Sequence, residues 1–350
     1  MRRQPKLLAA LAAVVFALTA TATLPAQDWA KAMLEKSPRH REYVPIKHGD
    51  RTVTAFVVYP EVSSKAPVIV MIHEIFGLSD WAKEMADELA AKGYIVVAPD
   101  LLSGAGPNGG GTDAFAGQDQ VTRAVSGLNA DQVTADLDAA ADYGKKLPAA
   151  NGKVYVAGFC WGGGKSFAFA THRHDLSAAF VFYGPPPPDD ALNAITAPVY
   201  GFYAGNDARI SATVPATTEK MKADGKKYDP VIYEGAGHGF MRAGQQPDAT
   251  DANQKAWEEG FKKMTGIISG GGSASLARPA HGSAVAAKAT RDAKRHTAAV
   301  KTVSVKSKSA SDAMDCHDMG MDTKTANSSK ETGGKSSAGK GMDMAEIMSM

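Results

Sequence analysis

The chain has 350 residues, enough for one large domain or two small ones, and its apolar content of 44% is ordinary for a globular protein. The formal net charge is only +2, and much of the positive charge lies after residue 270, in a segment without aromatic residues. Such a segment cannot bury enough apolar surface to offset the entropy of ordering it. We therefore expect one folded domain over 27–269, a disordered low-complexity tail over 270–350, and no nucleic-acid partner.

The first 26 residues have the pattern of a signal peptide. Basic residues near the start precede an apolar run over 7–18, and small residues then lead to candidate cleavage positions after Ala22 or Ala26. The apolar run is shorter than the ~20 residues that a membrane-spanning helix needs. We expect the mature protein to be exported, to the periplasm or the medium, without a membrane span.

Apolar, β-branched runs alternate with segments of helical periodicity through the middle of the chain. The expected elements, in chain order, are strands at 53–59 and 67–73, a helix at 79–92, a strand at 94–98, a helix at 130–147, a strand at 153–157, a helix at 162–171, strands at 178–183 and 198–203, a helix at 214–223, a strand at 231–233 and a helix at 253–268. The glycine-rich stretch at 104–111 lacks the lysine and spacing of a phosphate-binding loop, so we interpret it as a mobile rim. The alternation predicts an α/β fold with a mostly parallel sheet and helices on both faces.

The strongest local motif is Gly-Phe-Cys-Trp-Gly at 158–162, directly after a predicted strand and before a helix. It matches the nucleophile-elbow pattern G-x-S-x-G with Cys160 in the serine position. The glycines suit a strained strand-to-helix turn, where side chains would collide with the neighbouring strand or helix. A sulfur at a helix N-terminus is favoured as a thiolate. The alternative is a buried structural cysteine in an ordinary glycine-rich turn.

Two further residues follow the nucleophile in the order expected of this fold. Asp207 comes directly after the predicted strand at 198–203, and His238 comes after the strand at 231–233. We interpret the imidazole as the group that takes and returns protons and the carboxylate as the group that fixes its tautomer. Taken singly, Asp207 could be a turn-forming aspartate and His238 a loop histidine.

A fourth segment, His-Glu-Ile-Phe-Gly, follows the predicted strand at 67–73. This is where the fold supplies one oxyanion-hole amide, so the backbone N–H groups of Ile75 and Trp161 are the candidates. The charge of Glu74 beside a thiol disfavours the thiolate and needs a partner, for which Arg242 is best placed. The alternative is that both are surface charges.

Together these segments resemble the dienelactone hydrolase (carboxymethylenebutenolidase) family of the α/β-hydrolase superfamily. The matching motifs lie at 73–77, 158–163, 205–207 and 237–240. The resemblance implies Cys160 as nucleophile, His238 and Asp207 as its partners, and a small ester or lactone bearing a carboxylate as substrate.

The resemblance also implies a switch at the thiol. Glu74 pairs with an arginine, matched by Arg242, until the substrate carboxylate displaces it, and the freed glutamate then takes the thiol proton. A second arginine of the family grips the carboxylate, and Arg123 is its match. The signal segment, the glycine-rich loop, the proline run at 185–188 and the tail depart from the common members and leave the substrate open.

Alternative functions remain at this point. One is a general carboxylesterase or thioesterase on the same scaffold, and another is a non-catalytic envelope binding protein. The tail contains a group of soft potential metal ligands, namely Met314, Cys316, His317, Met319 and Met321. We expect no cofactor, no metal site, no disulfide between the chain's two cysteines, and a monomer.

Overall fold

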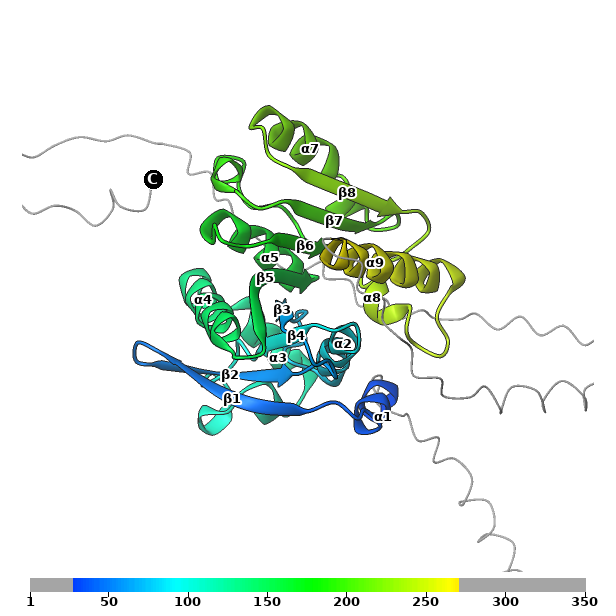
Figure 1. Ribbon diagram of the computed structural model, residues 1–350. Coiled ribbons are helices and arrows are strands. Elements are labelled where there is room, and N and C mark those ends of the chain that lie inside the picture. Colours follow the sequence, from blue (N-terminus) through cyan, green and yellow to red (C-terminus); the bar gives the residue numbers. More distant parts are fainter. Residues whose placement is uncertain (1–27, 271–350) are drawn as a thin grey trace, which may run out of the picture. The chain divides into compact units, whose positions relative to one another are not determined.

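The computed structural model describes residues 28–270 (Figure 1). The predicted signal peptide, and the predicted tail beyond Gly270 with its Met/Cys/His group, lie outside these residues. None of the helices within 28–270 is both long and apolar enough to cross a membrane.

The described residues form a single eight-stranded sheet in the order β1-β2-β4-β3-β5-β6-β7-β8. The pairs β1–β2 and β2–β4 are antiparallel, and all the other neighbouring strands are parallel. The strands are β1 (Arg41–His48), β2 (Arg51–Val58), β3 (Ala66–Ile72), β4 (Ile95–Pro99), β5 (Ala150–Phe159), β6 (Ala178–Phe182), β7 (Val199–Ala204) and β8 (Tyr228–Tyr233).

Helices cover both faces of the sheet (Figure 1). One layer contains α1, α2 and α9, and the opposite layer contains α4, α5 and α7. The helices are α1 (Asp28–Glu35), α2 (Asp80–Ala91), α3 (Gln118–Ser126), α4 (Ala130–Lys146), α5 (Trp161–His172), α6 (Ala208–Ser211), α7 (Val214–Ala223), α8 (Phe240–Ala243) and α9 (Asp251–Ser269). The predicted α/β fold is therefore confirmed.

The central strands form because their sequences are apolar on both faces. All five residues of β4 and of β6 are buried, as are all but one in β3. Such continuous runs are typical of parallel strands that lie between two helical layers. The starts of two helices are also fixed by residues close in sequence. The side chain of Ser79 accepts a hydrogen bond from the N–H of Ala82 at the start of α2, and the side chain of Asn129 accepts one from the N–H of Gln132 at the start of α4.

Strand β1 does not follow from the sequence pattern. It contains Pro45, and only Ile46 of its eight residues is buried. Proline removes a backbone donor, so it is tolerated in a strand mainly at the edge of a sheet, where β1 lies. The sequence also does not predict the short helices α6 and α8, because a segment of four residues is too short to show a helical periodicity of apolar residues.

Two glutamates of α2, Glu84 and Glu88, contact the segment that precedes α9. Glu84 is only 2% exposed, and Gln245 donates its side-chain amide to Glu84 at 3.3 Å and to Glu88 at 2.9 Å. Burial, reinforced by the charge of Glu88, raises the pKa of Glu84 from 4.5 to about 9. Glu84 therefore carries a proton at neutral pH in the folded protein.

We expect this proton to make stability depend on pH. The folded state binds it more tightly than the unfolded chain, so the stabilisation is complete below pH 4.5 and is lost progressively as pH rises toward 9. Glu84→Gln keeps a neutral group of the same shape, and its melting temperature should fall less between pH 5 and 9 than that of the wild type. The exposed Glu61→Gln is the control. Parallel melting curves for wild type and Glu84→Gln would contradict the assignment.

Candidate active site

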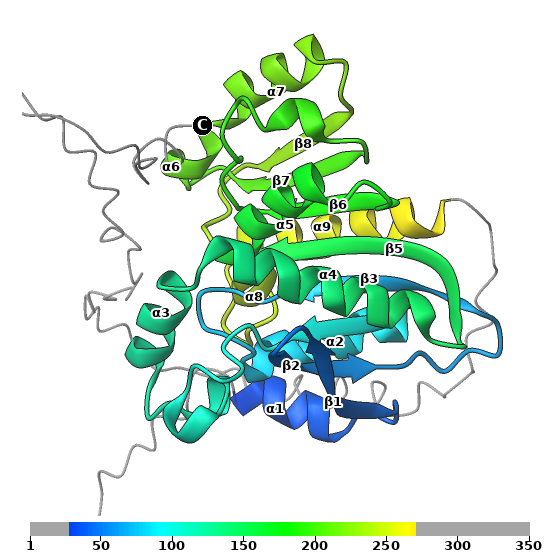
Figure 2. The same cartoon turned by 90° about the vertical axis from the view of Figure 1, so that its left-hand side faces the viewer.

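Four polar side chains follow the carboxyl ends of four parallel strands. Glu74 lies just beyond β3, Cys160 directly after β5, Asp207 beyond β7 and His238 beyond β8. The carboxyl ends of parallel strands meet at one edge of a sheet, which is where ligands bind in open α/β folds. Figure 2 shows α3, α6 and α8 at this edge.

Cys160 is on a strained turn. Its φ of 55° and ψ of −118° lie outside the regions that side chains ordinarily adopt, at a cost of about 1–3 kcal/mol. The turn is closely packed on both sides. A Cβ on Gly158 would lie 1.9 Å from the carbonyl oxygen of Gly162, and a Cβ on Gly162 would lie 2.3 Å from that of His73. A residue with a side chain could not replace either flanking glycine unless the neighbouring backbone moved.

Cys160, His238 and Asp207 form one hydrogen-bonded chain. His238 Nε2 lies 3.1 Å from Cys160 Sγ, and Nδ1 lies 2.6 Å from Asp207 Oδ2. Because an ionised carboxylate only accepts, Nδ1 donates and Nε2 faces the sulfur as the acceptor. Burial opposes the charge of Asp207, but the hydrogen bond and charge of His238 outweigh it and hold the pKa of Asp207 below its usual value.

Asp207 also has the turn-forming role that the sequence left open. Its Oδ1 accepts the N–H of Ile210 at 3.3 Å and so caps the first turn of α6. The two carboxylate oxygens thus have separate partners, Ile210 and His238. This arrangement fixes the direction in which the aspartate approaches the imidazole.

Glu74 and Arg242 form an ion pair beside this chain. Arg242 Nε donates to Glu74 Oε2 at 2.9 Å, and the side chain of Glu74 is 3% exposed while that of Arg242 is 24% exposed. The charge of Glu74 raises the pKa of Arg242. The guanidinium also lies 5.2 Å from the centre of the Phe76 ring, which fixes it over an aromatic face.

Tyr183 is a site residue that the sequence motifs did not single out. It is fully buried, and its hydroxyl donates to the second oxygen of Glu74 at 3.3 Å. Its ring lies edge-on to that of His238, with centroids 5.1 Å apart. Burial, together with the charges of Glu74 and Cys160, raises the pKa of Tyr183, so its hydroxyl stays protonated. The available signal was its position at the end of a predicted parallel strand.

The backbone N–H groups of the two predicted oxyanion donors make no hydrogen bond in the described part of the chain. Within residues 28–270, neither the N–H of Ile75 nor that of Trp161 has a hydrogen-bond acceptor. Trp161 is the first residue of α5, and Ile75, which is 2% exposed, belongs to an apolar cluster against which Cys160 and Trp161 pack, so both donors lie at the elbow. Unpaired backbone donors in such a position are rare in folded proteins unless a ligand uses them.

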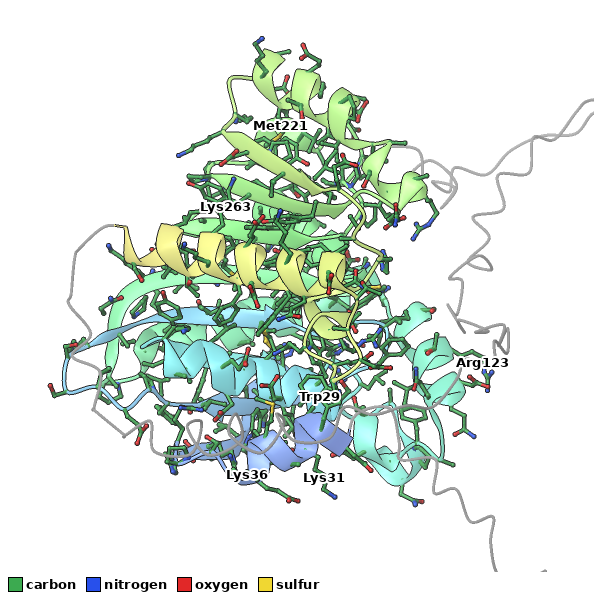
Figure 3. All side chains as sticks on the ribbon, turned by 90° about the vertical axis from the view of Figure 1, so that its right-hand side faces the viewer. Trp29, Lys31, Lys36, Arg123, Met221 and Lys263 are labelled. Atoms are coloured by element: carbon green, nitrogen blue, oxygen red, sulfur yellow. The ribbon has the colours of Figure 1, made fainter. Side chains whose placement is uncertain are left out.

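Arg123 lies apart from these residues. It is on α3, whose buried face contains Val121 and Val125, but its own side chain is exposed and points away from the sheet in Figure 3. The structure therefore does not bring Arg123 to the ion pair of Arg242. Its assignment as a second carboxylate-binding arginine stays a prediction.

No three His, Cys, Asp or Glu side chains within residues 28–270 are grouped as a metal site, and Cys160 forms no disulfide there. Cys316 lies outside the described residues.

The fold, with Cys160, Asp207 and His238 following successive strand ends in this order, is that of an α/β-hydrolase. The family model of the dienelactone hydrolase family matches residues 53–268. The chain therefore belongs to the dienelactone hydrolase family. This confirms the resemblance found in the motifs.

Individual relatives agree with this membership. A Salmonella typhi protein named "Putative carboxymethylenebutenolidase" is 32% identical over 60% of this chain and 80% of its own length. The carboxymethylenebutenolidase of Pseudomonas putida is 29% identical over 57% of this chain and 86% of its own. A crystal structure titled "Putative Dienelactone Hydrolase" from Klebsiella pneumoniae, 24% identical, matches with a TM-score of 0.58 over 66% of this chain and 98% of that one, which supports the fold.

Gly162→Ala tests the close packing at the elbow. The added methyl must displace the backbone of β3, so we expect a loss of at least ~2 kcal/mol of stability together with loss of activity. Gly266→Ala is the control, because Gly266 lies in α9 with no atom within 4 Å of the added Cβ. That change should raise stability by about 0.5–1 kcal/mol. Urea unfolding measures both; equal stability of Gly162→Ala and wild type would refute the packing argument.

Proposed function

We propose that the protein is an exported, cysteine-dependent hydrolase of small esters or lactones that bear a carboxylate. The observation that supports this most directly is the Cys160–His238–Asp207 chain with the Glu74–Arg242 ion pair beside it. The family membership supports the ester or lactone class, since a relative from Pseudomonas putida is named a carboxymethylenebutenolidase.

The chemistry follows from the positions of the groups. The thiolate of Cys160 attacks the ester carbonyl carbon, and the negative charge that forms on the carbonyl oxygen is bound by the N–H groups of Ile75 and Trp161. The carbon–oxygen bond to the alcohol breaks, and the leaving oxygen takes up the proton that the thiol lost. Water, deprotonated by His238, then cleaves the thioester and releases the acid and the thiol.

Glu74 and Arg242 supply the preference for an anionic substrate. Arg242 is the less buried member of the pair, at 24% exposed against 3%, so a substrate carboxylate competes with Glu74 for its guanidinium. Once Arg242 is engaged, Glu74 is a buried carboxylate without its countercharge, and such a group binds a proton more tightly. The nearby thiol of Cys160 is the donor, so the thiolate forms when the substrate is bound.

Export rests on the sequence of the first 26 residues. Mass spectrometry of the protein purified from its natural source should find a mature chain that begins near Thr23 or Gln27, outside the cytoplasm. An intact Met1 in the soluble cytosolic fraction would reject export and leave the hydrolase assignment untouched.

Cys160→Ala should abolish hydrolysis and leave the melting temperature nearly unchanged, because the thiol is placed for reaction. Cys316→Ala is the matched control, since it removes the chain's only other cysteine. Hydrolysis should be followed for carboxylate-bearing lactones and for neutral p-nitrophenyl esters. If Cys160→Ala keeps most of its activity, the central proposal is wrong. Equal rates on both substrate sets would instead indicate a general carboxylesterase.

Glu74→Gln should lower turnover of carboxylate-bearing lactones strongly, because no group then removes the thiol proton on demand. Glu61→Gln, an exposed change, should have no effect. In the Cys316→Ala background, iodoacetamide should label Cys160 slowly in the free protein and faster with succinate bound at Arg242. Wild-type turnover by Glu74→Gln would mean that His238 alone activates the thiol, and the carboxylate-specific part of the proposal should be abandoned.

A further inference from the structure

His73 is a buried residue that the mechanism above does not use. It follows β3 directly, is 1% exposed, and its Nδ1 lies 2.7 Å from the backbone carbonyl oxygen of Glu74. A carbonyl can only accept, so Nδ1 carries a proton. Burial lowers the pKa of His73, which is consistent with a neutral ring. Within the described residues Nε2 has no hydrogen-bond partner.

The hydrogen bond from His73 fixes a particular peptide plane. The carbonyl of Glu74 and the N–H of Ile75 belong to the same planar, trans peptide, so they point in opposite directions. The carbonyl also accepts the N–H of Gly77 at 3.2 Å. With its carbonyl held by two donors, this peptide cannot rotate, and the N–H of Ile75 is aimed away from them with no acceptor of its own.

The same imidazole contacts the segment that supplies the second donor. The rings of His73 and Trp161 are stacked, with centroids 5.6 Å apart and planes 11° apart. The backbone of His73 also meets the elbow, since its carbonyl oxygen is the atom that a Cβ on Gly162 would strike. One residue therefore touches both segments whose N–H groups are the predicted oxyanion donors.

We propose that His73 is a positioning residue for the oxyanion hole: it orients the N–H of Ile75 through the carbonyl of Glu74 and aligns Trp161 by stacking. This inference rests on the proposed cysteine hydrolase. His73 does not act as a second general base, because the ring is 1% exposed and its burial lowers the pKa of the imidazole, which makes Nε2 a weak base. Its contribution is to hold a donor in the direction in which charge develops.

Three variants separate the hydrogen bond from the packing. His73→Asn places an amide nitrogen at the same number of bonds from Cα as Nδ1, so it can donate to the carbonyl of Glu74. His73→Leu has nearly the shape of asparagine but no donor, and His73→Phe keeps a flat ring for Trp161 but no donor. Each is measured in the full chain on the best ester or lactone found for the wild type.

We expect kcat to fall about 10- to 100-fold in His73→Leu and His73→Phe with little change in KM, somewhat less than the loss when an oxyanion donor is deleted outright. His73→Asn should recover most of that loss. Affinity for a trifluoromethyl ketone, which forms an oxyanion adduct with Cys160, should fall by the same factor as kcat. Alkylation of Cys160 by iodoacetamide forms no oxyanion, so its rate should match that of the wild type in all three variants.

The outcomes distinguish this inference from the proposed function. If wild-type hydrolysis survives Cys160→Ala, the proposed function fails. If hydrolysis depends on Cys160 but His73→Leu has wild-type kcat, only the positioning role is overturned. It is likewise overturned if His73→Phe restores activity while His73→Asn does not, since His73 would then be a packing residue. A parallel loss of alkylation rate would mean that the whole elbow has shifted, which also contradicts it.

Discussion

The close approach of three backbones at the elbow is the constraint on which the rest of the site depends. The N-terminus of α5 meets the end of β3 through Gly162 and the end of β6 through Gly163, where an added Cβ would lie 2.3 Å from a carbonyl oxygen in each case. This contact places Cys160 at a helix N-terminus, with the segments that supply Ile75 and Tyr183 on either side. The backbone strain at Cys160 is tolerated because packing on three sides over-determines the turn.

A second constraint is electrostatic. Glu74 is almost completely buried, and its two oxygens have separate partners, the hydroxyl of Tyr183 and the guanidinium of Arg242. A buried carboxylate is stable only when it is paired in this way. Tyr183 also packs against His238, so the same ring supports both the carboxylate and the imidazole. Tyr183 therefore links the ion pair to the Cys160–His238–Asp207 chain within an apolar core, so a change in one of these groups affects the others.

The sequence predicted the strands and helices whose pattern of apolar and capping residues lies within a single segment of the chain. Continuous apolar runs identified β3 and β4, and a side-chain cap located the start of α2. It could not predict β1, whose pattern is set by its place at the sheet edge.

At the site, Cys160, Asp207 and His238 follow strand ends and were predicted by position. Tyr183 and His73 were not identified as candidates because their contacts with the site residues come from the folded structure and not from a sequence motif, and Arg123 was assigned in a region without a clear motif.

The unequal burial of the ion pair links the structure to the choice of substrate. Had both members been exposed, solvent would screen the pair and an arriving anion would gain little by replacing Glu74. Had both been buried, no substrate could reach the cation. Here the cation is accessible and the anion is not. In the proposed mechanism a substrate carboxylate exchanges for Glu74 at Arg242, while the charge of Glu74 stays in a buried position where water does not solvate it. In the proposed mechanism a proton from Cys160 neutralises this charge, so binding energy at the carboxylate is converted into nucleophilicity at the sulfur.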